Sequence, residues 1–106
     1  MAEIAFWEVF VLLSFPTDIN EKRKHIHIYK VNKHSSAFVA KIWLEKNNKK
    51  DISVAHYGNT KDAKAFDTKT ERELLSKIDE HWDSIMDKIN NFFSGKKLVG
   101  VINLNK

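Results

Sequence analysis

Residues 25–30, with the sequence HIHIYK, combine side chains that can act as acids, bases and hydrogen-bond donors. On a β-strand successive side chains point to opposite faces, so we expect His25, His27 and Tyr29 on one face and the two isoleucines on the other. The isoleucine face suits a hydrophobic core, and the histidine face suits a ligand or solvent. The segment therefore predicts a half-buried strand whose outer face could carry chemistry.

Two uses of this strand are chemically reasonable. A binding module would offer hydrogen bonds, stacking and positive charge to a protein, RNA or DNA partner. An RNA-cleaving toxin would instead use the strand from His25 to Lys30 for general acid–base chemistry on RNA. Binding is our leading expectation, because no further catalytic pattern accompanies the strand. The expected binding residues are Arg23, His25, His27, Tyr29, Lys30 and Lys41.

Metal binding through the two histidines of this strand is a third alternative. Histidines two residues apart on a strand lie roughly 7 Å apart at Cα and point the same way, so both imidazoles could reach one zinc ion. A further ligand would have to come from elsewhere in the fold, and His34, His56 and Glu45 are the candidates. The sequence contains no second spaced pair of ligands. We therefore expect no metal.

Other catalytic and cofactor motifs are missing from the sequence. Cysteine is absent, and no Gly-x-Ser-x-Gly elbow provides an activated serine. The glycines are Gly58, Gly95 and Gly100, so neither a dinucleotide-binding Gly-x-Gly-x-x-Gly motif nor a P-loop can be written. We therefore expect no cofactor, assign no catalytic residue and favour a non-enzymatic protein.

The formal net charge of +4 is unevenly distributed along the chain. Residues 1–21 hold four acidic residues and no basic one, whereas residues 22–64 hold eleven basic residues and three acidic ones. The basic charge therefore belongs to the predicted sheet. We expect a basic sheet face that attracts nucleic acid or an acidic protein, with an affinity that salt weakens.

Length and composition bound the organisation of the chain. A chain of 106 residues is expected to form one domain, here residues 1–106. The lack of cysteine fits a reducing compartment, so we expect a cytoplasmic protein. The apolar run 6–15 is interrupted by Glu8, follows Glu3 instead of a basic start, and is far too short to span a bilayer. We therefore expect no membrane association.

Apolar alternation and breaker residues predict an α+β fold. We expect strands at about residues 6–15, ended by Pro16, and at 25–31, 37–45 and 51–57. Short polar connections would join them into an antiparallel β-meander of about four strands. One face of that sheet is left for a helix to cover.

A single long amphipathic helix is predicted after the sheet. Thr70 and Glu73 form a capping box at its start, Thr68 is a competing start, and Gly95 ends the helix. Residues 98–104 are predicted to form a short final strand or arm. The apolar residues of the helix recur every three or four positions. They are Leu75, Ile78, Trp82, Ile85, Ile89 and Phe92, widened by Leu74, Met86 and Phe93.

The predicted helix is longer than the predicted sheet. About 24 helical residues span about 36 Å, whereas a strand of about seven residues spans about 23 Å. The tail or a loop could cover the excess, or the excess could pack on another copy of the chain. In that second case the contact residues of a homo-oligomer would be Ile89, Phe92 and Phe93.

Three segments, 25–29 (HIHIY), 40–45 (AKIWLE) and 85–93, together resemble the uncharacterised bacterial family catalogued as domain of unknown function 4160. That family pairs a His-x-His strand with an Ala-Lys-x-Trp-Leu strand and one C-terminal amphipathic helix, and the resemblance covers about residues 8–93. It implies a small α+β protein with a place in toxin–antitoxin-like gene pairs. It marks four positions without giving them a role: His25, His27, Lys41 and Trp43.

Overall fold

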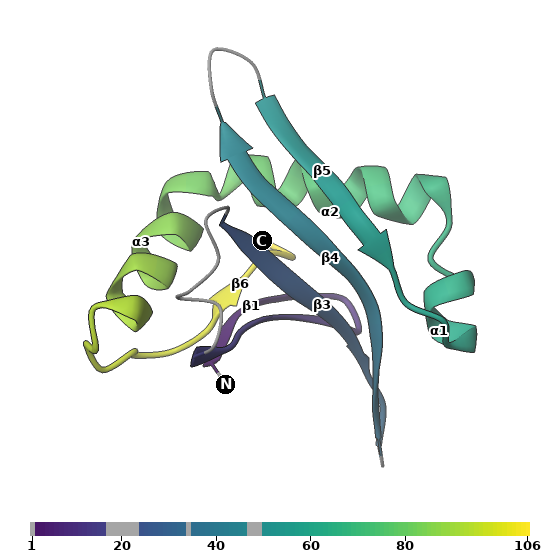
Figure 1. Ribbon diagram of the computed structural model, residues 1–106, viewed down its shortest axis with the longest axis horizontal. Coiled ribbons are helices and arrows are strands. Elements are labelled where there is room, and N and C mark those ends of the chain that lie inside the picture. Colours follow the sequence, from purple (N-terminus) through teal and green to yellow (C-terminus); the bar gives the residue numbers. More distant parts are fainter. Residues whose placement is uncertain (1, 17–23, 34, 47–49) are drawn as a thin grey trace.

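The computed structural model describes residues 2–16, 24–33, 35–46 and 50–106, and these form one sheet with helices packed on one of its faces (Figure 1). Over these residues the sheet has six strands, in the order β5-β4-β3-β2-β1-β6. The strands are β1 (Ala2–Trp7), β2 (Phe10–Ser14), β3 (His25–Val31), β4 (Ser36–Lys46), β5 (Lys50–Tyr57) and β6 (Ile102–Asn103). The helices are α1 (Lys61–Lys64), α2 (Thr68–Glu80) and α3 (Trp82–Phe93).

The sheet confirms the α+β class but differs from the predicted four-stranded antiparallel sheet. Strands β1 to β5 are joined by antiparallel pairings between neighbours, as a meander requires. The short β6 then pairs in parallel with β1, so the sheet is mixed and larger than predicted. A two-residue pairing at the far end of the chain leaves no alternating pattern in the sequence, which is why its direction was missed.

The predicted opening strand, residues 6–15, is wrong, because the structure has a hairpin there. Strands β1 and β2 pair antiparallel, and Trp7 lies opposite Phe10. Glu8 takes a positive φ of 54° between them. Its backbone N–H donates to Asn105 Oδ1 at 3.0 Å, so the C-terminal segment holds the turn in place. The turn was hidden because positive φ is usually the role of glycine or asparagine.

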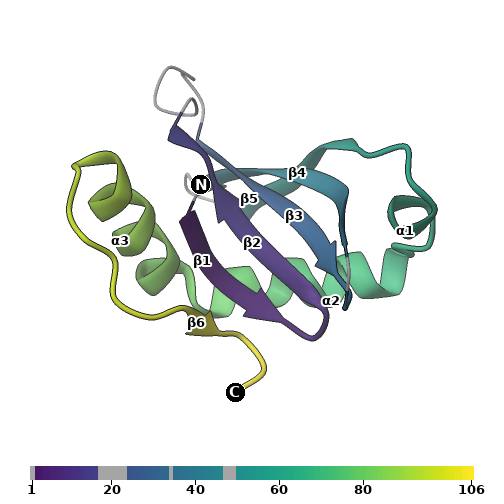
Figure 2. The same ribbon diagram turned by 90° about the horizontal axis from the view of Figure 1, so that it is seen from below.

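The predicted single helix is divided into α2 and α3 at His81, which has φ −106° and ψ 25°. The predicted capping box at Thr70 is also wrong. Asp67 is the N-cap, and its carboxylate accepts from the backbone N–H of Thr70 at 2.8 Å, so the competing start at Thr68 is correct. The break lets α2 pass along β5 while α3 turns toward β1, as the two views show (Figures 1 and 2).

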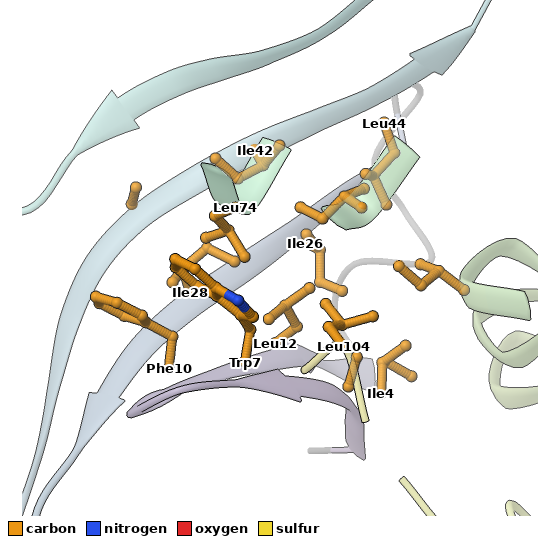
Figure 3. Packing of buried hydrophobic residues seen from close by; sticks show 14 of the residues in the cluster. Ile4, Trp7, Phe10, Leu12, Ile26, Ile28, Ile42, Leu44, Leu74 and Leu104 are labelled. Carbon is orange, nitrogen blue, oxygen red and sulfur yellow. The ribbon is translucent and has the colours of Figure 1, made fainter. Parts of the chain in front are cut away.

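A mainly aliphatic core of described residues fills the space between the sheet and the helices. Figure 3 shows Ile26 and Ile28 of β3 beside Leu12 of β2 and Leu74 of α2. All four side chains are fully buried. The apolar stripe of the helical segment therefore packs inward as predicted, with its fully buried members being Leu74, Ile78, Ile85 and Ile89.

The C-terminal segment closes this core beside β1. Leu104 is fully buried and lies near Ile4 in Figure 3. Its backbone N–H donates to Phe6 O at 2.9 Å, and Lys88 of α3 donates from Nζ to Val99 O at 3.0 Å. The predicted final strand or arm at 98–104 is therefore shortened to β6 and its flanks. Among the described residues, no helix is long and apolar enough to cross a membrane.

Candidate functional site

The sheet face opposite α2 and α3 gathers the chemistry-bearing side chains of the strands, and we call it the open face. Cross-strand pairing brings Leu13, His27, Lys41 and His56 into one row, because directly paired residues project to the same side. The described side chains of the open face include Glu3, Phe6, Val11, Leu13, Phe15, His25, His27, Tyr29, Phe38, Lys41, Trp43, Ser53 and His56.

Rings on the open face contact one another without interruption from β2 to β5. His27 lies at the centre, with ring centroids 4.8 Å from Phe15, 5.0 Å from His25 and 6.1 Å from Phe38. Tyr29 joins Phe15 and Phe38 at 6.3 Å and 5.6 Å. These separations fall in the range of favourable edge-to-face and tilted pairs. The open face is therefore an aromatic and imidazole surface.

One end of the ring cluster is formed by His25, Trp43 and Lys41. The rings of His25 and Trp43 are 6.0 Å apart and nearly perpendicular, at 89°. Lys41 Nζ lies 5.1 Å from the centroid of the Trp43 ring, a cation–π contact. His25 is only 3% exposed, whereas Lys41 and Trp43 are half-buried. His25 therefore supports this end from within, and the other two can meet a ligand.

The other end of the cluster is fixed by the backbone around Phe38. The Phe38 ring lies 5.6 Å from that of His56, which is exposed. A Cβ added at Gly58 would come within 2.4 Å of Phe38 O, so glycine is required for this close approach. Gly58 N–H also donates to Val39 O at 2.8 Å, and Thr60 Oγ1 donates to Phe38 O at 3.2 Å. Phe38 is thus held in place by the chain that follows β5.

Two β-bulges set which residues of β4 and β5 reach the open face. The register slips between Ile28 and Tyr29, where β4 contributes the extra residue Val39, and again between Lys41 and Ile42, where β5 contributes Ala55. A bulge adds one residue and so reverses the alternation beyond it. The first bulge places Phe38 on the same face as Lys41, and the second places His56 there.

Two of the six predicted binding residues do not belong to the described open face. Lys30 pairs with Phe10 on the core side, and its Nζ lies 3.1 Å from Asp62 Oδ1 of α1. Arg23 lies outside the described residues. The remaining four, His25, His27, Tyr29 and Lys41, are brought together. Sequence reasoning missed Phe15 and Phe38, named His56 only as a candidate metal ligand, and marked Trp43 only through the family resemblance.

The positive charge of the open face is smaller than the sequence predicts. Among the described side chains of the strands, Lys41 is the lysine that lies on the open face. Lys24, at the start of β3, donates from Nζ to Asn90 Oδ1 of α3 at 2.6 Å, and Lys30 pairs with α1. Two lysines near β3 therefore tie the sheet to its helices.

The described titratable groups do not gather into a metal centre. Among the described residues, no group of three or more histidine, aspartate or glutamate side chains could hold a metal ion. Tyr57 Oη donates to the Glu71 carboxylate of α2, and that bond, burial and the negative charge together raise the pKa of Tyr57. Tyr57 is paired with Ala40 on the core side, so this contact joins β5 to α2 away from the open face.

The three residues predicted for a homo-oligomer do not form one exposed surface. Ile89 is fully buried in the core. Phe93 is half-buried and packs against the core, and Phe92 contacts it with ring centroids 5.2 Å apart. The expectation also depended on one long helix, which is replaced by the two shorter helices α2 and α3. Only Phe92 and Phe93 keep exposed surface for such a contact.

A depression of about 430 Å³ adjoins the ring cluster on the side of β1 and β2. Phe15 and Tyr29 contribute aromatic walls, and Glu3 contributes a carboxylate. Its full lining is Glu3, Val11, Leu13, Phe15, Tyr29, Val31, Asn32, Ser35 and Ser36. Volumes of about 300–1,000 Å³ are usual for small-ligand sites.

Comparisons of the chain with protein families, with curated proteins and with solved structures give no match.

Proposed function

We propose that this protein is a small, non-enzymatic binding module whose open face holds single-stranded RNA. The observation that carries the proposal is the continuous ring cluster from Phe15 to His56, which lies on the sheet face that α2 and α3 leave uncovered. Bases have two flat faces and stack on aromatic and imidazole rings without sequence preference. A sheet that carries several such rings can therefore hold successive bases of one strand.

The partial burial of the rings supports this use. Tyr29, Phe38 and Trp43 are half-buried, so each keeps a part of its surface for a ligand. Their mutual contacts limit their rotation before binding, and rings that are already ordered lose little side-chain entropy on binding. Stacking of a base on an ordered ring contributes about 1–3 kcal/mol per base.

The charge of the face fits an RNA strand in a modest way. Lys41 lies in the row between His27 and His56, where it can contact a phosphate beside stacked bases. The formal net charge of +4 adds a weak long-range attraction. Affinity should therefore fall with salt, but by less than for a face lined with lysine and arginine.

RNA cleavage is the second candidate function, and one observation favours it. His27 is directly paired with Lys41, which is directly paired with His56, so one lysine lies between two histidines in a single row of the sheet. One imidazole could take the proton of a ribose 2′-hydroxyl as its oxygen attacks the adjacent phosphate, and the other could protonate the 5′-oxygen as its bond to phosphorus breaks. The ammonium could stabilise the charge that develops on the phosphate. The ring contacts of both histidines with Phe38 favour stacking as their main use.

The cellular setting remains a prediction. The resemblance to the family of unknown function 4160 supports a place in a toxin–antitoxin-like gene pair, and the cysteine-free sequence supports the cytoplasm. A protein partner for the open face is the competing form of the binding proposal. A neighbouring gene for a small antitoxin-like protein would favour the gene-pair setting.

A titration of fluorescently labelled single-stranded RNA, followed by anisotropy at low and at physiological salt, tests the proposal. The RNA is then run on a denaturing gel. We expect salt-sensitive binding and intact RNA. Cleaved RNA would favour the second function, provided that His27→Ala abolishes cleavage without loss of fold. No binding at either salt would contradict both functions and direct the search to a protein partner by pull-down.

A further inference from the structure

The depression beside the ring cluster has the features of a pocket for one base. Tyr29 is shared between the two, because it lines the depression and also contacts Phe38 in the ring cluster. Phe15 stands beside it, with its ring centroid 6.3 Å from that of Tyr29. A strand stacked along the open face would therefore reach the depression without leaving the aromatic surface. The inference rests on the proposed function and adds sequence preference to it.

The polar groups of the depression are placed at its rim. Asn32 Oδ1 accepts from Ser35 N at 2.9 Å and from Ser35 Oγ at 3.0 Å, and Asn32 N donates to Ser35 O at 2.9 Å. These three bonds fix the rim on the side of β3 and β4. The walls between are apolar, from Val11 and Leu13 of β2. An apolar slot with a fixed polar rim is the usual form of a site that orients a flat heterocycle.

Glu3 gives the depression a chemical preference. Its carboxylate is exposed at the edge formed by β1, opposite Leu13. Within the described part of the chain, no basic side chain or hydrogen-bond donor pairs with it. A carboxylate on a face that binds a polyanion is unfavourable unless it meets donors of the ligand. Guanine offers two parallel donors, N1–H and the 2-amino group, which match the two carboxylate oxygens.

We infer that this depression is a guanine pocket, in which the base packs against Phe15 and Tyr29 on one side and Glu3 accepts from its Watson–Crick edge. The other bases fit the carboxylate less well. Adenine and cytosine each present one amino group beside a ring acceptor, and uracil presents one N–H between two carbonyl groups. Each of these places an acceptor of the base against a carboxylate oxygen, which is repulsive and leaves an oxygen unpaired.

The test compares labelled oligouridine with the same strand carrying one central guanosine, inosine, adenosine or cytidine. We expect guanosine to raise affinity roughly tenfold over the other bases, the discrimination typical of a bidentate pair. Inosine lacks the 2-amino group and should fall between guanosine and adenosine. Glu3→Gln should remove the guanosine preference. Glu8→Gln is the matched control, because it removes the same charge from the neighbouring turn and should keep the preference.

The outcomes separate this inference from the proposed function. Equal binding of all five strands would overturn the guanine pocket and leave single-strand binding in place. A guanosine preference that survives Glu3→Gln would overturn the role of Glu3. No binding of any strand would contradict the proposed function itself. Glu3 is exposed, so its substitution should leave the fold intact, which thermal unfolding of the variant would check.

Discussion

The two faces of the sheet differ in chemistry although their residues alternate along the same strands. On the helix side, the cross-strand row Leu12, Ile28 and Ala40 is fully buried. One position along, the row Leu13, His27 and Lys41 meets no helix and includes two half-buried polar side chains. One strand can therefore stabilise the fold with alternate residues and offer the residues between them for binding, because neighbouring side chains point to different faces.

The aromatic content of the two faces sharpens this contrast. The helix side is mainly aliphatic, with Trp7, Phe10 and Phe66 gathered at one edge. The open face holds four aromatic and three imidazole rings in mutual contact: Phe15, Tyr29, Phe38, Trp43, His25, His27 and His56. Aliphatic side chains fill a core well, whereas flat rings with exposed edges and faces suit a stacked ligand.

The largest expected effect is on the free energy of unfolding, and it distinguishes two adjacent residues of β3. Ile28→Ala should lower the free energy of unfolding by about 2–5 kcal/mol, because it leaves a cavity in the core. His27→Ala, one residue away, should cost about 1 kcal/mol or less. Urea denaturation of both variants measures the difference. Similar losses from the two variants would contradict this difference, because the open face would then stabilise the fold as much as the core does.

The next effect concerns the binding of RNA by the open face. Trp43→Leu keeps an apolar side chain but removes the ring, and it should weaken single-stranded RNA binding roughly tenfold. Phe92→Leu is the matched control on α3, where an aromatic ring lies away from the open face and should leave affinity unchanged. Anisotropy titrations provide the affinities. Equal affinity of wild-type protein and Trp43→Leu would remove Trp43 from the binding surface.

A smaller effect, on the salt dependence of RNA affinity, distinguishes Lys41 from Lys30, whose side chains lie on opposite faces of the sheet. Lys41→Gln should reduce the slope of log affinity against log salt by about 0.7, the loss of one phosphate contact on a single strand. Lys30→Gln should leave that slope unchanged, because Lys30 pairs with Asp62 on the helix side. The titrations are repeated at several salt concentrations. A reduced slope for Lys30→Gln alone would reverse the assignment of the faces.

The smallest effect belongs to the helix side and depends on pH. The N–H of Thr70 bonds to the Asp67 carboxylate and lowers the pKa of Asp67. Because the pKa is lower in the folded state, the ionised carboxylate stabilises the fold at pH values above the pKa of the unfolded state. This stabilisation is lost as the pH falls through the pKa of the folded state. Asp67→Ala should therefore destabilise the protein modestly at neutral pH, and the difference from wild type should shrink below about pH 4.

Thermal unfolding of wild type and Asp67→Ala at neutral and at acidic pH checks this dependence. A constant difference across that range would contradict the role of the carboxylate as a charged cap. RNA affinity at neutral pH is the second readout, and it should be the same for both proteins, since Asp67 starts α2 and lies outside the open face.

The sequence predicts the central strand and the direction of its side chains well. β3 has the predicted bounds, 25–31, and its isoleucines are buried while His27 and Tyr29 are half-buried on the other face. Alternation of this kind is a local signal, because the residue types along one strand are enough to show which side chains share the buried face. The apolar face of the helical segment was predicted equally well, because its apolar residues recur at helical spacing.

The assembly of the open face could not be predicted, because it depends on bulges between strands. Simple alternation along β4 would place Phe38 with Ala40 and Ile42 on the core face. The extra residue Val39 reverses that parity, and Ala55 does the same for His56. A bulge is a property of two paired strands and leaves no residue pattern in either one. The interruption at His81 is likewise set by the fit of two helices to one sheet.

The three tryptophans allow the most direct test of the central claim, that the open face binds RNA. Trp43 lies on the open face, Trp7 in the core and Trp82 at the start of α3. Their indole N–H resonances can be followed by NMR while a ten-nucleotide single-stranded RNA is added. We expect the Trp43 resonance to shift and those of Trp7 and Trp82 to stay in place. Shifts confined to Trp7 or Trp82, or no shift at all, would contradict it.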